Sequence, residues 1–491
     1  MGVTRPACED GGYAVPTTTA PRRPRRGVVG SAALVAAVLA VGAVGIVPTS
    51  SATPSSAVTA AVAAAPAVPG VVLPATTGVV TGTPASRDAA LAAAVTAALS
   101  SPALGSDVAV SVVDAVTGAT VLARGDGRPQ KPASTLKLLT AIAVLRALGP
   151  DARLSTRVVQ GATPRDLVLV GGGDATLTRV PATSTPAGQA ARPTSMAALV
   201  TATVTALKAA SRGSVTVQVD DSLFTGPRTA SGWPAAYTAS GIIAPVSALS
   251  VDQGARSTGA TSRSSDPALA AGAAFVAGLK SAGIAVLGPV TRVTAPATAA
   301  ELAAVQSPTI SQLVERMLTN SDDALAEALA HLAGGKLAGN ASFAGGAAAT
   351  VSTLNDLGVR VDGVSLHDGS GLSLQNLVPT STLVGALAAV ALDKPANGET
   401  AGVLWPVSTG MPVAGVTGTL ATRFDTSGTA VGRGVVRAKT GTLTGVDCLA
   451  GVVRGASGRL LAFAVLADST PGPQTASRTA LDRAASAVAT G

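Results

Sequence analysis

A nearly continuous apolar stretch between Pro132 and Leu148 constrains the fold more than any other part of the sequence. Proline suits the start of a helix, and a helix that is apolar on every side has to be buried inside a larger body. We therefore predict a buried helix that begins after Pro132. Two polar residues of its first turn, Ser134 and Lys137, are three positions apart, so hydroxyl and amine lie on one helical face.

The pair formed by Ser134 and Lys137 has two interpretations. A lysine in an apolar setting loses solvation, its pKa falls, and it can take the proton of a nearby serine, which then becomes a nucleophile. Alternatively, Ser134 caps the helix and the amine of Lys137 reaches the surface. Because so short a pattern is common, the rest of the sequence has to decide between them.

Composition limits both the core and the chemistry. Aromatic residues make up only 2% of the 491 residues, so Ala, Val and Leu have to fill the core. The net charge of +8 is partly concentrated in the first 26 residues and is too dilute elsewhere to indicate nucleic-acid binding. The cysteines, Cys8 and Cys448, lie on opposite sides of a membrane segment or cleavage site, so we expect no bridge between them.

Neither histidine indicates a metal site or a Ser-His-Asp triad. His331 and His367 have no cysteine or second histidine at ligand spacing. A triad would have to use one of them, and the nearest serine motif, Gly369-Ser-Gly371, lacks the spacing Gly-x-Ser-x-Gly. We predict neither a metal nor an organic cofactor.

The N-terminal 84 residues form three predicted segments. Residues 1–26 are basic and polar, residues 27–47 are uncharged and long enough to cross a membrane, and residues 48–84 are an Ala/Pro/Thr-rich linker. The positive-inside rule places residues 1–26 in the cytoplasm and everything after residue 48 outside. Whether residues 27–47 are a membrane anchor or a cleaved signal segment stays open. Both alternatives make the functional part extracytoplasmic.

The remaining sequence divides into two regions of different character. Residues 85–155 and 306–491 mix helical and strand patterns, whereas residues 156–305 contain short Val-rich strands between Gly, Pro and Ser clusters. We predict a discontinuous α+β domain with a large, mainly β insertion. Within residues 434–466, three strands joined by short turns predict an antiparallel meander.

Two further motifs follow the first. Ser321-Asp-Asp323 lies between predicted helices over residues 310–318 and 324–332, and Lys439-Thr-Gly441 lies on a predicted strand. Alone, Ser321-Asp-Asp323 would be an ordinary turn with capping residues. Together with Ser134-x-x-Lys137, they form an ordered set on a helix, a loop and a strand.

This set resembles the motifs of the penicillin-recognising serine enzymes. The long interval between Lys137 and Ser321 and several other stretches resemble the D-alanyl-D-alanine carboxypeptidase/endopeptidases, the class C low-molecular-mass penicillin-binding proteins (peptidase family S13). The resemblance begins at about residue 86 and implies the fold of the serine β-lactamases and penicillin-binding proteins. The stretches are Leu169–Leu177, Val219–Phe224, Pro245–Val251, Asp368–Ser373 and Gly415–Leu420.

The resemblance implies catalytic roles for three residues. Ser134 would attack the carbonyl between two D-alanines of a peptidoglycan stem peptide, or a β-lactam ring, and Lys137 would be its general base. Ser321 would relay a proton to the departing amine. Action on wall peptides would place the protein in the cell membrane through residues 27–47, or in the cell wall after secretion.

The resemblance also implies binding roles. Lys439 and Thr440 would hold the terminal carboxylate of the substrate. Gly441 would let the substrate backbone lie along the strand. The backbone N–H groups of Ser134 and Thr442 would form an oxyanion hole.

Asp323, expected in the substrate-binding site, departs from the pattern because the family usually has Asn there. An amide can donate to a substrate carbonyl, whereas a carboxylate only accepts. An ionised Asp323 would also favour the charged forms of Lys137 and Lys439, which opposes a base role for Lys137. Three functions stay open: an active DD-carboxypeptidase or endopeptidase, which we favour; a β-lactamase, against which the insertion argues; and a non-catalytic wall-binding protein.

Overall fold

The computed structural model describes residues 83–182, 192–393 and 402–491. The predicted segments 1–26 and 27–47, and nearly all of 48–84, lie outside the described residues, as does Cys8. In the part of the chain that is described, no helix is long and apolar enough to cross a membrane.

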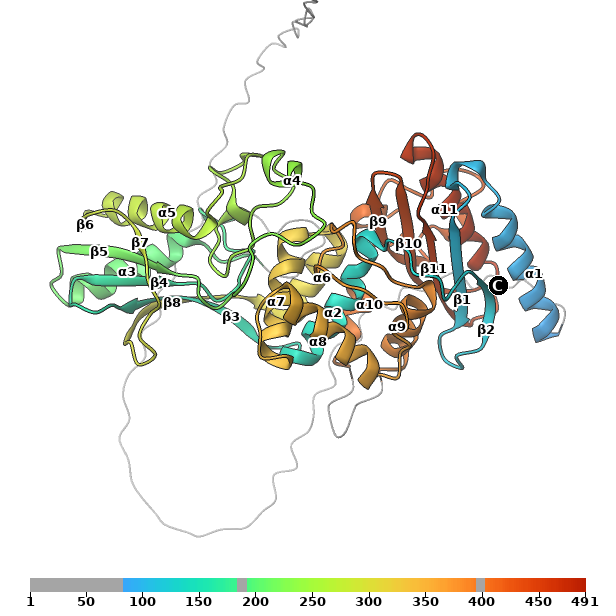
Figure 1. Cartoon of the computed structure of the whole chain (residues 1–491), viewed down its shortest axis with the longest axis horizontal. Helices are drawn as coiled ribbons and strands as arrows, with labels where there is room; N and C mark the ends of the chain where they lie inside the picture. Colours follow the sequence, from blue (N-terminus) through green and yellow to red (C-terminus); the bar gives the residue numbers. More distant parts are fainter. Residues whose placement is uncertain (1–82, 183–191, 394–401) are drawn as a thin grey trace, which may run out of the picture. The chain divides into compact units, whose positions relative to one another are not determined.

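A five-stranded antiparallel sheet forms one part of the discontinuous domain (Figure 1). Strand β1 pairs with β11, so segments from opposite ends of the sequence meet inside this sheet. The predicted C-terminal meander is confirmed, and its first strand, β9, lies at the sheet edge. In sheet order the strands are β2 (Thr120–Arg124), β1 (Val108–Asp114), β11 (Leu460–Ala467), β10 (Val446–Arg454) and β9 (Val436–Leu443).

Helices cover both faces of this sheet. On one face, α1 (Pro84–Ala98) and α11 (Gln474–Val488) pack against each other and against the strands. On the other face, α9 (Thr380–Leu392) contacts β1, β10 and β11. The core under α1 and α11 is built almost wholly from Ala, Val and Leu, with Phe424 and Phe463 as its two aromatic residues among the described positions. This matches the core expected from the composition.

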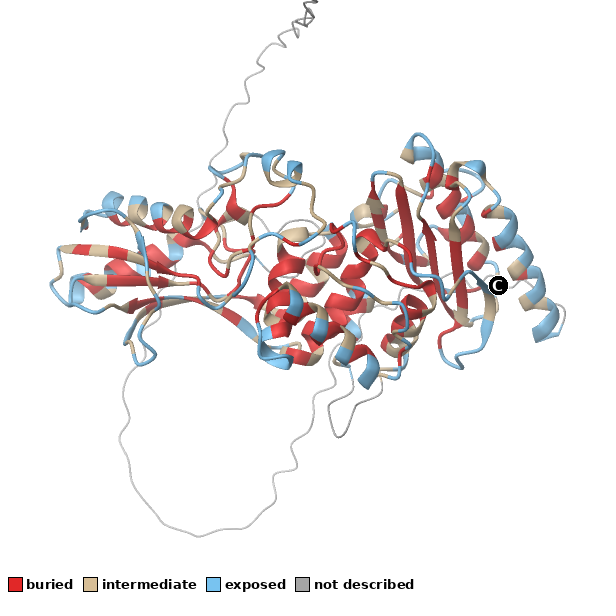
Figure 2. Ribbon diagram, in the orientation of Figure 1, coloured by how far each residue is buried: buried red, intermediate tan, exposed pale blue. Residues whose placement is uncertain are grey.

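Helix α2 (Lys137–Leu148) is the buried centre of the helical part. Ten of its twelve residues are buried, as Figure 2 shows along its length, so the prediction of a buried helix is confirmed. The preceding turn, Ala133–Leu136, is a 3₁₀ helix, which moves the start of the α-helix to Lys137. The helices around α2 are α6 (Ile310–Asn320), α7 (Asp323–Leu337), α8 (Phe343–Asp356), α9 and α10 (Trp405–Gly410).

A second sheet lies in the insertion. Its strand order is β6-β5-β4-β3-β8, and β7 pairs with β5. Strand β3 pairs antiparallel with β4 and β8, whereas β5 pairs parallel with β4 and with the short β6 and β7. The strands are β3 (Arg153–Gln160), β4 (Asp166–Val170), β5 (Ser214–Asp220), β6 (Ala285–Val286), β7 (Thr291–Arg292) and β8 (Glu301–Thr309).

The insertion is less dominated by strands than we predicted. Two helices, α3 (Met196–Ala209) and α5 (Pro267–Ser281), pack against this sheet and against each other, and a short α4 (Ala236–Ala239) lies between them in sequence. Both long helices carry ordinary start signals: Ser195 and Asp266 cap them, and Pro267 occupies the first turn of α5. The insertion is therefore a mixed α/β structure.

Removing the side chain of Leu139 is expected to destabilise the protein strongly. Leu139 is fully buried on α2, and Leu139→Ala leaves a cavity that costs about 2–5 kcal/mol. Val116, 59% exposed in the β1–β2 turn, is the control, and Val116→Ala should cost at most about 0.5 kcal/mol. Urea unfolding measures both variants. Equal midpoints would contradict the central position of α2.

Candidate active site

Ser134 lies in a tight turn in front of α2. The residue before it, Ala133, has φ of 45°, in the left-handed region that residues other than glycine rarely adopt. Two glycines let other segments approach this turn: a Cβ at Gly371 would lie 1.9 Å from the carbonyl oxygen of Ala133, and one at Gly441 would lie 2.7 Å from that of Pro132. Gly441 is therefore needed for the contact between β9 and this turn, besides any role toward substrate.

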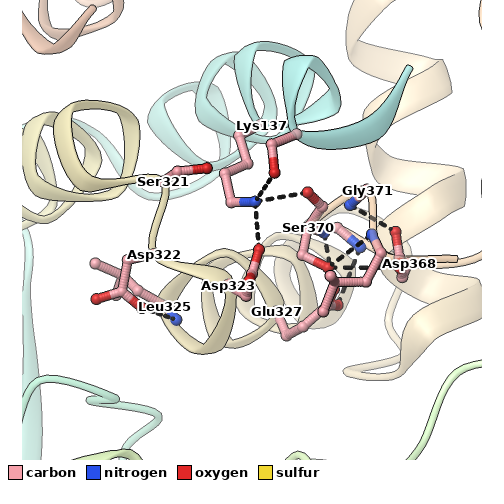
Figure 3. Close-up of polar contacts among 12 residues, drawn as sticks. Lys137, Ser321, Asp322, Asp323, Leu325, Glu327, Asp368, Ser370 and Gly371 are labelled. Atoms are coloured by element: carbon pink, nitrogen blue, oxygen red, sulfur yellow. Dashed lines mark hydrogen bonds and ion pairs between the residues drawn. The ribbon is translucent and has the colours of Figure 1, made fainter. Parts of the chain in front are cut away.

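The buried amine of Lys137 donates hydrogen bonds to three oxygens (Figure 3). They are Ser134 Oγ at 2.9 Å, Asp323 Oδ1 at 2.6 Å and the carbonyl oxygen of Ser370 at 2.7 Å. Three acceptors match the three protons of an ammonium. For Lys137 to take a proton from Ser134, it first has to release one of its own.

A second lysine–serine pair involves Lys439 and Ser321. Ser321 ends α6 with a left-handed φ of 57°, and Lys439 Nζ donates to its Oγ at 2.9 Å and to the carbonyl oxygen of Thr440 at 2.8 Å. Burial lowers the pKa of Lys439 well below its usual value, the charge of Lys137 lowers it further, and Asp323 partly opposes this. Without a ligand, burial therefore favours the neutral amine of Lys439.

Four of the expected binding residues, Lys439 to Thr442, are consecutive on the edge strand β9. Thr440 Oγ1 donates to Thr419 Oγ1 at 2.9 Å, and Thr442 Oγ1 donates to Asp447 Oδ1 on β10 at 3.0 Å. Thr419 lies in the stretch Gly415–Leu420, which resembles the family but which the sequence did not connect with the site.

The loop between α6 and α7 is fixed through Asp322. This residue caps α7, because its Oδ1 accepts from the N–H of Leu325 at 3.1 Å. Its carboxylate also accepts from Arg316 Nε at 3.3 Å and from the amide of Gln253 in the insertion. Asp322 therefore orients the start of the helix from which Asp323 reaches Lys137, as Figure 3 shows.

Glu327 supports the third acceptor of Lys137. It lies one helical turn after Asp323 on α7, is fully buried, and accepts from the N–H groups of Gly369 at 3.0 Å and Ser370 at 2.8 Å. Burial and the nearby charge of Asp368 raise the pKa of Glu327 to about 8. The sequence did not single out Glu327, although its i, i+4 spacing from Asp323 could have indicated it.

Asp368 fixes the loop that contains Ser370. Its carboxylate accepts from the N–H groups of Gly371 at 2.9 Å and Ser373 at 2.6 Å, and from Asn376 Nδ2 at 2.7 Å. The stretch Asp368–Ser373 was noted for its resemblance to the family. A backbone carbonyl has no sequence signal, so the role of Ser370 was not predicted.

A cavity of about 440 Å³ opens beside Ser321 and Asp323. Ile242, Gln253 and Arg263 of the insertion line it together with Arg316, Ser321 and Asp323. Among the described residues, no group of His, Cys, Asp and Glu side chains could hold a metal ion.

Comparisons with known proteins identify the relatives of this chain. Its sequence matches the D-Ala-D-Ala carboxypeptidase 3 (S13) family over residues 91–263 and 255–488. A carboxypeptidase of Mycobacterium tuberculosis is 38% identical over 391 residues, covering 78% of this chain and 80% of the relative. The carboxypeptidase DacB of Mycolicibacterium smegmatis is 36% identical over 396 residues, covering 79% and 81%.

The fold also matches a solved structure. Penicillin binding protein 4 of Haemophilus influenzae gives a TM-score of 0.65 at 23% identity, covering 80% of this chain and 97% of that protein. A complex of the same protein with a β-lactam gives a TM-score of 0.58. The predicted α+β fold of a penicillin-binding protein is confirmed.

Glu327 is expected to make stability fall as pH rises. Its folded-state pKa of about 8 lies above the ordinary value of 4.5, so its contribution is complete below pH 4.5 and is lost as pH rises toward 8. Glu327→Gln removes this titration. Between pH 5 and pH 8, the melting temperature of Glu327→Gln should therefore fall by several degrees less than that of the wild type. The exposed Glu301→Gln should keep the wild-type slope, and an unchanged slope in Glu327→Gln would contradict the assignment.

Proposed function

Because this chain belongs to the D-Ala-D-Ala carboxypeptidase 3 (S13) family, we propose that it is a serine-type carboxypeptidase and endopeptidase of peptidoglycan stem peptides. The observation that carries this proposal is the 2.9 Å hydrogen bond between Lys137 Nζ and Ser134 Oγ in a strained turn. Peptidoglycan lies outside the cytoplasmic membrane, so the proposed site of action is extracytoplasmic. Residues 27–47 would anchor the protein or direct its secretion.

The proposed reaction proceeds through an acyl-enzyme. After Lys137 has released one proton, Ser134 Oγ attacks the carbonyl between the two D-alanines while Lys137 takes the hydroxyl proton. The C–N bond then breaks, and the departing amine receives, through Ser321, the proton that Lys137 took. Since Lys439 Nζ donates to Ser321 Oγ, the hydroxyl proton of Ser321 stays available for that transfer. Water finally hydrolyses the ester, which restores Ser134.

The terminal carboxylate of the substrate is proposed to bind Lys439 and Thr440. Burial favours the neutral form of Lys439, so an incoming carboxylate supplies the charge that stabilises its ammonium. Thr442 and Ser134 contribute backbone N–H groups to the developing oxyanion. A β-lactam carries a carboxylate and a strained carbonyl, and we expect it to acylate Ser134.

A second candidate function is a penicillin-binding protein with little or no peptide turnover. The 2.6 Å ion pair between Lys137 and Asp323 favours it, because the carboxylate stabilises the charged amine. Acylation would then be slow, and release of D-alanine slower than in a homologous site with an amide at this position.

Mass spectrometry after incubation with penicillin tests the nucleophile. The wild type should gain the mass of one penicillin, and Ser134→Ala should gain none. Ser231→Ala is the matched control because Ser231 also contacts a basic group, with its Oγ 3.0 Å from His367 Nδ1. That variant should be labelled like the wild type. Labelling of Ser134→Ala would refute the proposed nucleophile.

Asp323→Asn distinguishes the two candidate functions. Replacing the carboxylate by an amide removes the charge that is paired with the Lys137 amine, so acylation at neutral pH should become about tenfold faster. Stopped-flow acylation and D-alanine release measure the two steps. If the wild type is labelled without releasing D-alanine and Asp323→Asn releases it, the second candidate holds. An unchanged acylation rate in Asp323→Asn would exclude any control by Asp323.

A further inference from the structure

We propose that the insertion holds the hydrogen-bond acceptors of the catalytic lysine in place, with Gln253 and Trp233 as positioning residues. This inference rests on the proposed function, because it concerns the same site. Of the three acceptors of Lys137 Nζ, Asp323 Oδ1 and the carbonyl oxygen of Ser370 come from segments outside its own helix. A side chain of the insertion holds each of these segments from the other side.

Gln253 holds the segment that carries Asp323. Its Nε2 donates to both carboxylate oxygens of Asp322, at 2.8 Å and 2.7 Å. Asp322 also caps α7 through the N–H of Leu325, so its orientation sets the first turn of that helix. Asp323 is the first residue of this turn.

The backbone at Gln253 is strained, and hydrogen bonds from neighbouring residues hold it in this conformation. Asp252 and Gln253 have φ of 50° and 54°, two consecutive left-handed residues other than glycine. Arg263 Nη1 donates to the carbonyl oxygens of both, at 3.2 Å and 3.4 Å, and Asp252 Oδ1 accepts from the N–H of Arg179 at 2.9 Å. Such strain persists where surrounding contacts impose it, and it occurs often at functional sites.

Trp233 holds the segment that carries Ser370. Its Nε1–H donates to Asp368 Oδ2 at 2.7 Å, and this carboxylate organises the loop up to Ser373. The indole packs edge-on against Phe343, with ring centroids 5.5 Å apart, so the direction of its N–H is fixed. Ser373 Oγ adds a second link by donating to the carbonyl oxygen of Ser231 at 2.7 Å.

The two links act on the lysine indirectly. In the described part of the chain, the hydrogen bonds of Lys137 reach Ser134, Asp323 and Ser370, and none of these belongs to the insertion. Loosening either link lets an acceptor move, and the position of Nζ relative to Ser134 Oγ then varies. The chemical step should slow while binding of the ligand changes little.

Acylation kinetics of the full chain with benzylpenicillin test the positioning role of Gln253 and Trp233. Gln253→Met keeps the length of the side chain and removes the donor, and Trp233→Phe keeps an aromatic ring and removes the N–H. Each should lower the acylation rate constant at saturating penicillin about tenfold, change the dissociation constant less than twofold and leave one labelled site per chain. Gln218→Met, on strand β5 of the same insertion, is the control and should behave like the wild type.

Three results would overturn the proposal. The first is an unchanged acylation rate constant in both variants. The second is a lower fraction of labelled sites with an unchanged rate constant, since that shows a role in folding alone. The third is unchanged hydrogen exchange of the amides of Leu325, Gly371 and Ser373. The proposal predicts that these amides exchange faster in the variants than in the wild type. This last measurement decides the matter even if wild-type protein resists acylation, which would refute only the proposed function.

Discussion

The structure of the site depends on one buried amine and the three oxygens around it. Lys137 has no exposed surface, and a charged group removed from water has to be paired and hydrogen-bonded. One acceptor comes from its own turn, one from the start of α7, and one from the loop after Asp368. The close approach of Gly371 to the Ala133 turn and the support of Ser370 by Glu327 follow from this requirement.

The other ionisable groups of the site adjust to this ion pair. Burial lowers the pKa of Lys439 and raises that of Glu327, so both tend toward their neutral forms near neutral pH. The ion pair between the buried amine of Lys137 and the partly exposed carboxylate of Asp323 then places a charge directly beside the proposed base. An amide at position 323 would offer its oxygen in place of the carboxylate, so the lysine would keep three acceptors but lose the charge beside it, which is why this single residue governs the expected rate.

The sequence predicted the parts of the site that depend on local spacing. Ser134 and Lys137 face each other because they are three residues apart, and flanking patterns placed Ser321 in a loop and Lys439 on a strand. Glu327, the Ser370 carbonyl and Gln253 were not predicted, because their roles arise from contacts between distant segments. In the insertion, the Val-rich strands were recognised, whereas α3 and α5 were missed although Ser195, Asp266 and Pro267 mark their starts.

A crystal structure of the protein after treatment with penicillin tests the central claim most directly. The account predicts an ester bond from Ser134 Oγ to the carbonyl carbon of the opened ring, Lys137 Nζ within hydrogen-bond distance of Ser134 Oγ, and the penicillin carboxylate beside Lys439 and Thr440. An unmodified Ser134 in fully treated crystals, or an adduct on another side chain, would contradict it.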